Sequence, residues 1–117
     1  MGDTDIEEMS YHFALRIVKL NEYLHTKRHF VLAKQILRSR TAIGALVCEA
    51  QYAQSRADFV HKPRIGLKEA NETRYWLRSL RDSDYLDLKS FESLKRNLER
   101  IIRVLSKIIN TSKKSSL

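Results

Sequence analysis

Residues 55–80 read SRADFVHKPRIGLKEANETRYWLRSL. Their small and apolar side chains recur at alternating steps of four and three residues, which is the spacing of a helix packed along one face. The members of this first row are Phe59, Pro63, Gly66, Ala70, Thr73, Leu77 and Leu80. The stretch therefore predicts a long helix with one face in a helical core.

A second row of side chains lies beside the first and contains two glutamates and the tryptophan of the chain. Its members are Lys62, Ile65, Glu69, Glu72, Trp76 and Ser79. A helix packed against a single neighbour does not require such a row, so a second helix or another subunit should cover it. We expect ion pairing or a subunit contact at Arg38, Glu49, Glu69, Glu72 and Trp76, with Arg38 as the favoured partner of the two row carboxylates. Such a pair fixes the register of two helices more than it adds net stability.

Pro63 interrupts the helical pattern of this stretch. A proline in a helix interior removes a backbone hydrogen bond and clashes with the preceding turn. Two readings follow, a helix that is kinked near Pro63 or a helix that begins there, and the sequence leaves both open.

Apolar residues at the same steps extend in both directions from the central stretch. They predict helices over about 5–25, 29–54, 56–81 and 87–110, joined by short polar connections that favour antiparallel neighbours. In the last helix, Glu92 and Arg96, and likewise Glu99 and Arg103, have the spacing of helix-stabilising ion pairs. We expect an all-α, antiparallel up-down-up-down four-helix bundle that forms one domain over 1–117, with 111–117 as a disordered basic tail.

Composition limits the class of protein. The single cysteine, Cys48, cannot form a disulfide within the chain, and the N-terminal segment is acidic where a signal peptide would be basic and then apolar. No apolar run approaches the roughly 20 residues that cross a bilayer. We therefore expect a soluble, cytoplasmic protein that has no membrane partner.

The net charge of +8 is unevenly distributed, because acidic side chains outnumber basic ones in the first 26 residues. A basic surplus in the remainder favours a polyanionic partner, although many basic surfaces serve only solubility. The candidates for phosphate contact are Lys27, Arg28, Lys34, Arg56, Lys62, Arg64, Arg74, Arg78, Arg81, Arg96, Arg100, Arg103, Lys107, Lys113 and Lys114. Arg56, Lys62, Arg64, Arg74, Arg78 and Arg81 are preferred among them, and the last three form one row at steps of four and three. Phe59 and Trp76 suit packing better than base stacking, so contacts to the backbone with weak sequence preference are expected.

Candidate catalytic and metal-binding groups are few. Glu22 and His25 have the Glu-x-x-His spacing of di-iron bundles, but such a site needs a second copy of the motif and two further carboxylates. His25 and His29 are four residues apart, with a predicted turn between them. The sequence has no glycine-rich phosphate loop and no recognisable nucleophile motif. We therefore expect no enzymatic activity, no cofactor and no metal.

Three segments, LRSRTAIGALVCEA (37–50), SRADFVHK (55–62) and KEANETRYWL (68–77), together resemble the S23-like proteins encoded by intervening sequences of bacterial 23S rRNA genes. The matching positions are Arg38, Ser39, Ile43, Glu49, Ser55, Asp58, Phe59, Lys68, Glu69, Ala70, Glu72, Trp76 and Leu77. The chain departs from the family pattern at Ala42, Leu46, Ala50, Pro63 and Gly66.

The resemblance implies a four-helix bundle that assembles as a ring-like homopentamer, and it supplies no known reaction. A related branch, the accessory protein of diversity-generating retroelements, binds a reverse transcriptase and nucleic acid. The expected function is thus a non-enzymatic, basic, oligomeric module that binds nucleic acid, RNA more readily than DNA, through its phosphates. The alternative is a scaffold that holds an acidic protein partner such as a polymerase or reverse transcriptase.

Overall fold

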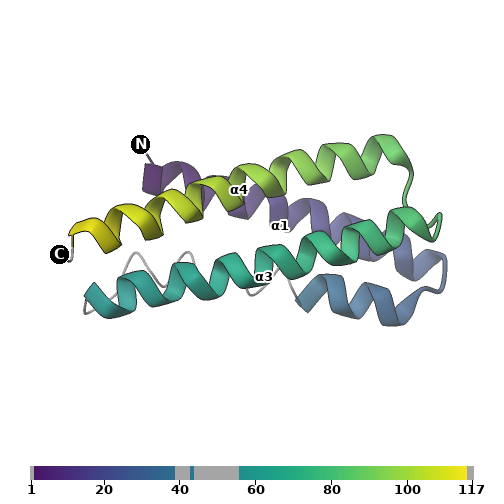
Figure 1. Ribbon diagram of the computed structural model, residues 1–117. Coiled ribbons are helices and arrows are strands. Elements are labelled where there is room, and N and C mark those ends of the chain that lie inside the picture. The colour runs from purple at the N-terminus through teal and green to yellow at the C-terminus, as the bar shows by residue number, and fades with distance from the viewer. Residues whose placement is uncertain (1, 39–42, 44–55, 116–117) are drawn as a thin grey trace.

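The computed structural model describes residues 2–38, 43 and 56–115, and this part of the chain is helical apart from short turns (Figure 1). Helix α1 spans Gly2–Thr26, α3 spans Arg56–Asp82 and α4 spans Leu88–Ser115. Between α1 and α3, residues 30–38 and residue 43 are helical. The described residues contain no strand. The predicted all-α four-helix architecture is confirmed.

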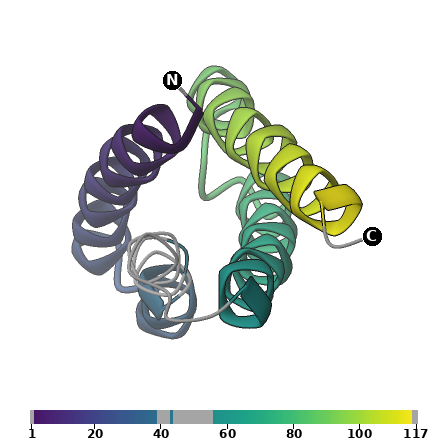
Figure 2. The same ribbon diagram turned by 90° about the vertical axis from the view of Figure 1, so that its left-hand side faces the viewer.

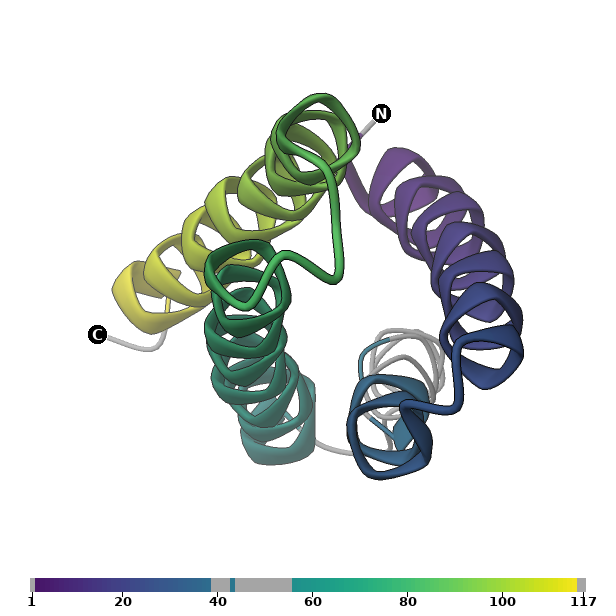
Figure 3. The same cartoon turned by 90° about the vertical axis from the view of Figure 1, so that its right-hand side faces the viewer.

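The helices lie around a common centre, with each neighbour in the sequence also a neighbour in space (Figure 2). The molecule is elongated, with extents of 49 × 22 × 20 Å. α1 begins and α4 ends at one end of the bundle, and the turn after α1 and the α3–α4 connection lie at the other end (Figures 1 and 3). α4 packs against both α3 and α1. This connection end becomes important for the candidate site.

The core is a continuous apolar cluster built from the rows that the sequence shows. From Pro63 onward, every member of the first row of α3 is buried. The hydroxyl of buried Thr73 donates to the carbonyl of Glu69 at 2.8 Å, so its polar group is satisfied within the helix. The fully buried large side chains of the other helices are Ile6, Phe13, Ile17, Leu24, Ile36, Ile43, Phe91, Leu98, Ile101 and Leu105.

The two turns at the connection end share one backbone design. Arg28 and Asp84 both have φ 64, the left-handed region. The amide of Arg28 donates to the His25 carbonyl at 3.0 Å, and the amide of the next residue, His29, donates to the Leu24 carbonyl at 2.8 Å. In the second turn, the amide of Asp84 donates to the Arg81 carbonyl at 3.0 Å, and the amide of Tyr85 donates to the Leu80 carbonyl at 2.9 Å. Both helices thus end in a Schellman motif, which satisfies their last carbonyls and reverses the chain sharply.

Two expectations about helix limits need correction. α3 begins at Arg56 and continues through Pro63, which is buried, so the reading in which the helix begins at Pro63 is wrong. α4 is helical to Ser115, so the expected disordered tail does not start at residue 111. The basic sequence TSKKS suits the negative end of the helix dipole, which favours extension of the helix.

No helix in the described ranges is both long enough and apolar enough to cross a membrane.

Candidate nucleic-acid interface

The outward face of α4 carries a row of positive charge. Between residues 89 and 107 the helix has five exposed positions, and a basic side chain occupies each of them. Their steps of seven, four, three and four residues keep all five on one narrow face, over about 27 Å of helix at 1.5 Å per residue. We call this row the α4 stripe, and its members are Lys89, Arg96, Arg100, Arg103 and Lys107.

The charges of the α4 stripe are not neutralised within the described part of the chain, where none of the five side chains has an ion-pair or hydrogen-bond partner. The predicted pairing of Glu99 with Arg103 is not formed. Glu99 lies toward the side of the helix and pairs with Lys95 at 3.6 Å instead. Consequently the cations remain available to a ligand.

The basic row predicted on α3 is largely engaged by neighbouring side chains. Arg81 Nε donates to Asp82 Oδ1 at 2.8 Å, and its guanidinium lies 4.4 Å from the centre of the Phe91 ring. Arg74 donates to Asn71 Oδ1 at 2.7 Å. Arg81 thus joins α3 to α4, and the phosphate contacts expected of these arginines stay a prediction.

The other predicted phosphate contacts are dispersed. Arg64 and Arg78 are exposed on the outer face of α3, whereas Lys62 is half-buried in its second row. The side chain of Arg56 lies outside the described residues. Of the five preferred cations whose side chains are described, Arg64 and Arg78 are exposed and Lys62, Arg74 and Arg81 are half-buried, so they do not form one uniformly exposed row.

The second row of α3 faces the helical segment of residues 30–38. Arg38 Nη2 lies 4.0 Å from Glu72 Oε1, the contact expected between these elements, but the side chains are 66% and 40% exposed and so are not a buried pair. Trp76 is half-buried against the core, with the Tyr75 ring 5.2 Å away. Glu69 is also half-buried. Glu49 lies outside the described residues.

The histidines considered as metal ligands make ring contacts instead. His29 stacks on Tyr85 with ring centres 3.7 Å apart, and His25 tilts against Phe30 at 5.3 Å. Within the described ranges, no three or more His, Cys, Asp or Glu side chains are grouped closely enough to hold a metal ion. Cys48 lies outside these ranges.

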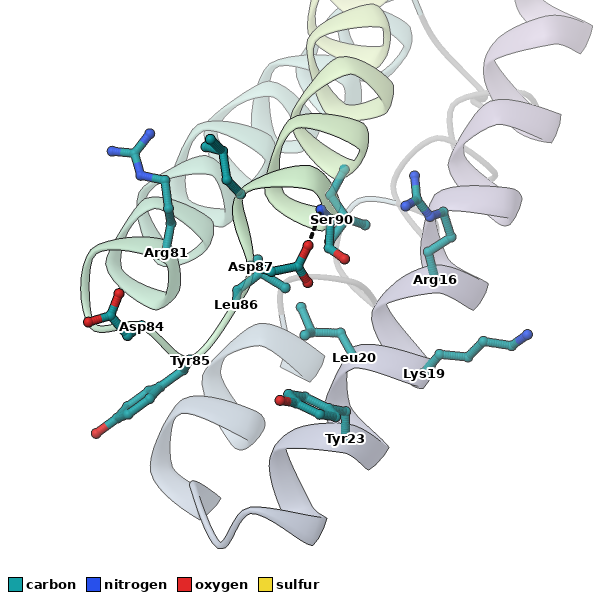
Figure 4. Close-up of a pocket in the computed structure, with 12 residues that line it drawn as sticks. Arg16, Lys19, Leu20, Tyr23, Arg81, Asp84, Tyr85, Leu86, Asp87 and Ser90 are labelled. Carbon is teal, nitrogen blue, oxygen red and sulfur yellow. Dashed lines mark hydrogen bonds between the residues drawn. The ribbon is translucent and has the colours of Figure 1, made fainter.

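A cavity of about 760 Å³ opens at the connection end, between α1, the α3–α4 connection and the start of α4 (Figure 4). We call it the end cavity. Leu20, Leu86 and Leu94 give it an apolar lining, and Arg16, Lys19, Tyr23 and Asp87 add polar groups, whereas Arg81 and Tyr85 project away from its centre. Sequence spacing could not reveal this site, because it joins side chains from separate segments.

Asp87 immediately precedes α4 and also lines the end cavity. Its Oδ2 accepts a hydrogen bond from the Ser90 amide at 2.9 Å, which caps the helix. Hydrogen bonds from the Ser90 side chain and backbone lower the pKa of Asp87, so this carboxylate is ionised at neutral pH.

Both the sequence and the fold of this chain are similar to those of known proteins. The family described as 23S rRNA-intervening sequence protein matches residues 2–107. A solved structure from Bacteroides thetaiotaomicron, a protein of unknown function from the S23 ribosomal protein family, is similar with a TM-score of 0.91 and 46% identity. The match covers 94% of this chain and 99% of that one. No match was found among curated proteins.

Proposed function

This chain belongs to the family of 23S rRNA-intervening sequence proteins, and we propose that it is a non-enzymatic, oligomeric module that binds nucleic acid through phosphate contacts. The observation that carries the proposal is the α4 stripe, whose five exposed cations lack partners within the described residues. Like charges on one helix face repel each other, so an anion that bridges them is stabilising.

The geometry of the α4 stripe suits a polyanion with regularly spaced charges. Successive arginines at steps of four and three residues are separated by about 4.5–6 Å along the helix axis. Binding of phosphates by such a row releases condensed counterions, and this release supplies most of the affinity of non-specific complexes. RNA is the favoured ligand only by association with the family, whose description names 23S rRNA.

Assembly with further copies of the chain is the second part of the proposal, and the family resemblance implies a homopentamer. Tyr11 and Leu15 lie one turn apart on the outer face of α1 and are 59% and 44% exposed. Large apolar side chains that are grouped on a surface favour association. Light scattering at micromolar concentration should give a multiple of the 13.8 kDa chain mass, whereas a monomer mass would overturn this part.

A scaffold for an acidic protein partner is the alternative use of the same cations. Direct binding experiments separate the two functions. Fluorescence anisotropy should detect binding to structured RNA, and to single-stranded DNA more weakly, with an affinity that falls steeply between about 50 and 200 mM salt. Heparin serves as the control polyanion.

The outcomes of this experiment are distinct. RNA binding that exceeds heparin binding at matched charge supports the nucleic-acid module. If neither RNA nor DNA binds at about 100 mM salt, the proposal fails and the scaffold becomes the better explanation.

A further inference from the structure

We infer that the end cavity accepts an unpaired nucleotide of the nucleic acid that lies along the α4 stripe, an inference that rests on the proposed function. The site would make the protein selective for single-stranded segments or overhanging ends, which an evenly charged helix face does not distinguish from a duplex.

The first observation is continuity between the cavity and the stripe. Leu88 and Ser90 line the end cavity, and Lys89, the first member of the stripe, lies between them in the sequence. A smaller hollow of about 230 Å³ lies further along the α1–α4 seam and is lined by Arg100, another stripe residue. A strand whose phosphates follow the stripe therefore passes beside both hollows.

The second observation is the size and lining of the end cavity. Its volume of about 760 Å³ falls within the roughly 300–1,000 Å³ typical of small-molecule pockets. Leu88, which lines the cavity and is 64% exposed, offers an apolar surface to the flat face of a base, and the buried side chains of Leu20, Leu86 and Leu94 complete the apolar lining. Tyr23, which is 48% exposed, extends from α1 at the edge of the cavity, where its ring can stack with a base (Figure 4).

The third observation is the separation of charge across the cavity. Arg16 and Lys19 lie on the α1 side, and the Asp87 carboxylate projects from the opposite side (Figure 4). Arg16 Nη1 donates to Asn97 Oδ1 on α4, which orients the guanidinium and leaves its other N–H groups for a phosphate. Asp87 supplies an acceptor for the amino group of a base.

A paired base does not fit this arrangement. In a duplex, the faces of each base are covered by its stacked neighbours, and its amino group is engaged with the opposite strand. Only an unpaired nucleotide presents its face to Tyr23, its edge to Asp87 and its phosphate to Lys19 at the same time. The cavity therefore adds affinity for unpaired nucleotides alone.

The test compares three RNA probes of matched charge by fluorescence anisotropy: a single strand, a blunt duplex and a duplex with a short overhang. We expect the single strand and the overhang to bind several-fold more tightly than the blunt duplex. The double substitution Tyr23→Ala and Lys19→Gln should remove this difference and leave affinity for the blunt duplex nearly unchanged.

The matched control is Tyr75→Ala with Lys34→Gln, which alters an exposed tyrosine and an exposed lysine that do not line the cavity and should keep the preference. Circular dichroism shows whether each variant folds. Equal affinity of the unmodified protein for the three probes overturns this inference while the proposed function stands. Absence of binding to every probe overturns the proposed function itself.

Discussion

Helices α3 and α4 both carry basic side chains on their outer faces, but they differ in what those side chains contact. On α3, Arg74 bonds to Asn71, and Arg81 bonds to Asp82 and covers the ring of Phe91. On α4, the five cations of the stripe have no such partner among the described residues. Arg64, Lys68 and Arg78 are also exposed on α3, but Asn71 and Tyr75 separate them, whereas the exposed cations of α4 form one row of five. The arrangement of available charge in one row, rather than its amount, identifies the candidate binding surface.

The difference has a local cause in the placement of acidic and amide side chains. Asn71 precedes Arg74 by three residues and Asp82 follows Arg81 directly, so both arginines find acceptors on their own helix. On α4 the acids are turned away from the stripe. Glu92 and Glu99 are half-buried, and Glu99 is held by Lys95.

The largest effect that separates the two helices should be on nucleic-acid affinity. We predict that replacing Arg96, Arg100 and Arg103 together by Gln weakens RNA binding roughly 10²–10³-fold near 0.1 M salt, because each lost phosphate contact forfeits counterion release. The slope of log affinity against log salt should decrease in magnitude by about 2–3. A salt series followed by fluorescence anisotropy measures both quantities.

The matched control removes three exposed charges from α3, at Arg64, Lys68 and Arg78. Its effect should stay below about tenfold, because in the proposed complex these side chains do not contact phosphates and act only through long-range attraction, which salt screens. An equal loss of affinity in the two variants would assign the binding surface to both helices.

Much of the fold could be predicted from one stretch of sequence. The first row of α3 identifies its buried face because burial of apolar side chains must follow the helix period. The contact of Arg38 with Glu72 was also expected, since the second row of α3 needed a neighbouring helix. The role of Pro63 could not be predicted in the same way. A proline is compatible with both a kinked helix and a helix start, and the neighbouring sequence does not decide between them.

The candidate site was harder to predict than the fold, for two physical reasons. In α4, Glu92 and Glu99 lie four residues before Arg96 and Arg103, a spacing typical of ion pairs, which conceals a free basic row. The side-chain exposures that reveal the stripe depend on how α4 rotates between α1 and α3. The end cavity depends on three separate segments that only the folded chain brings together.

The α3–α4 connection should determine how the two helices respond to acid. Within the described residues, lowered carboxyl pKa values occur at Asp82, chiefly through its hydrogen bond from Arg81, and at Asp87, through hydrogen bonds from Ser90. A depressed folded-state pKa contributes stability that is present above the unfolded value of 3.8 and is lost as pH falls through the folded value.

We predict that thermal stability falls as pH is lowered below about 4, beyond the general effect of rising positive charge. Asp87→Asn should keep an acceptor at the start of α4 and yet reduce this acid-dependent loss, as followed by circular dichroism melts from neutral to acidic pH. Glu7→Gln, which removes an exposed carboxylate from α1, should retain the acid sensitivity of the unmodified protein. Identical pH profiles for the unmodified protein and Asp87→Asn would contradict the role of this cap.

The smallest expected effect concerns the contact that α3 makes on its other side. A double-mutant cycle with Arg38→Gln and Glu72→Gln should give a coupling free energy of about 0.2–0.5 kcal/mol, at the low end for exposed pairs. The coupling free energy is small because Arg38 Nη2 and Glu72 Oε1 are 4.0 Å apart and the Arg38 side chain is 66% exposed. The coupling should vanish in about 1 M salt, where screening acts within about 3 Å. A coupling above about 1 kcal/mol that persists in high salt would show that the pair is shielded from solvent, as a subunit contact over the second row of α3 would do.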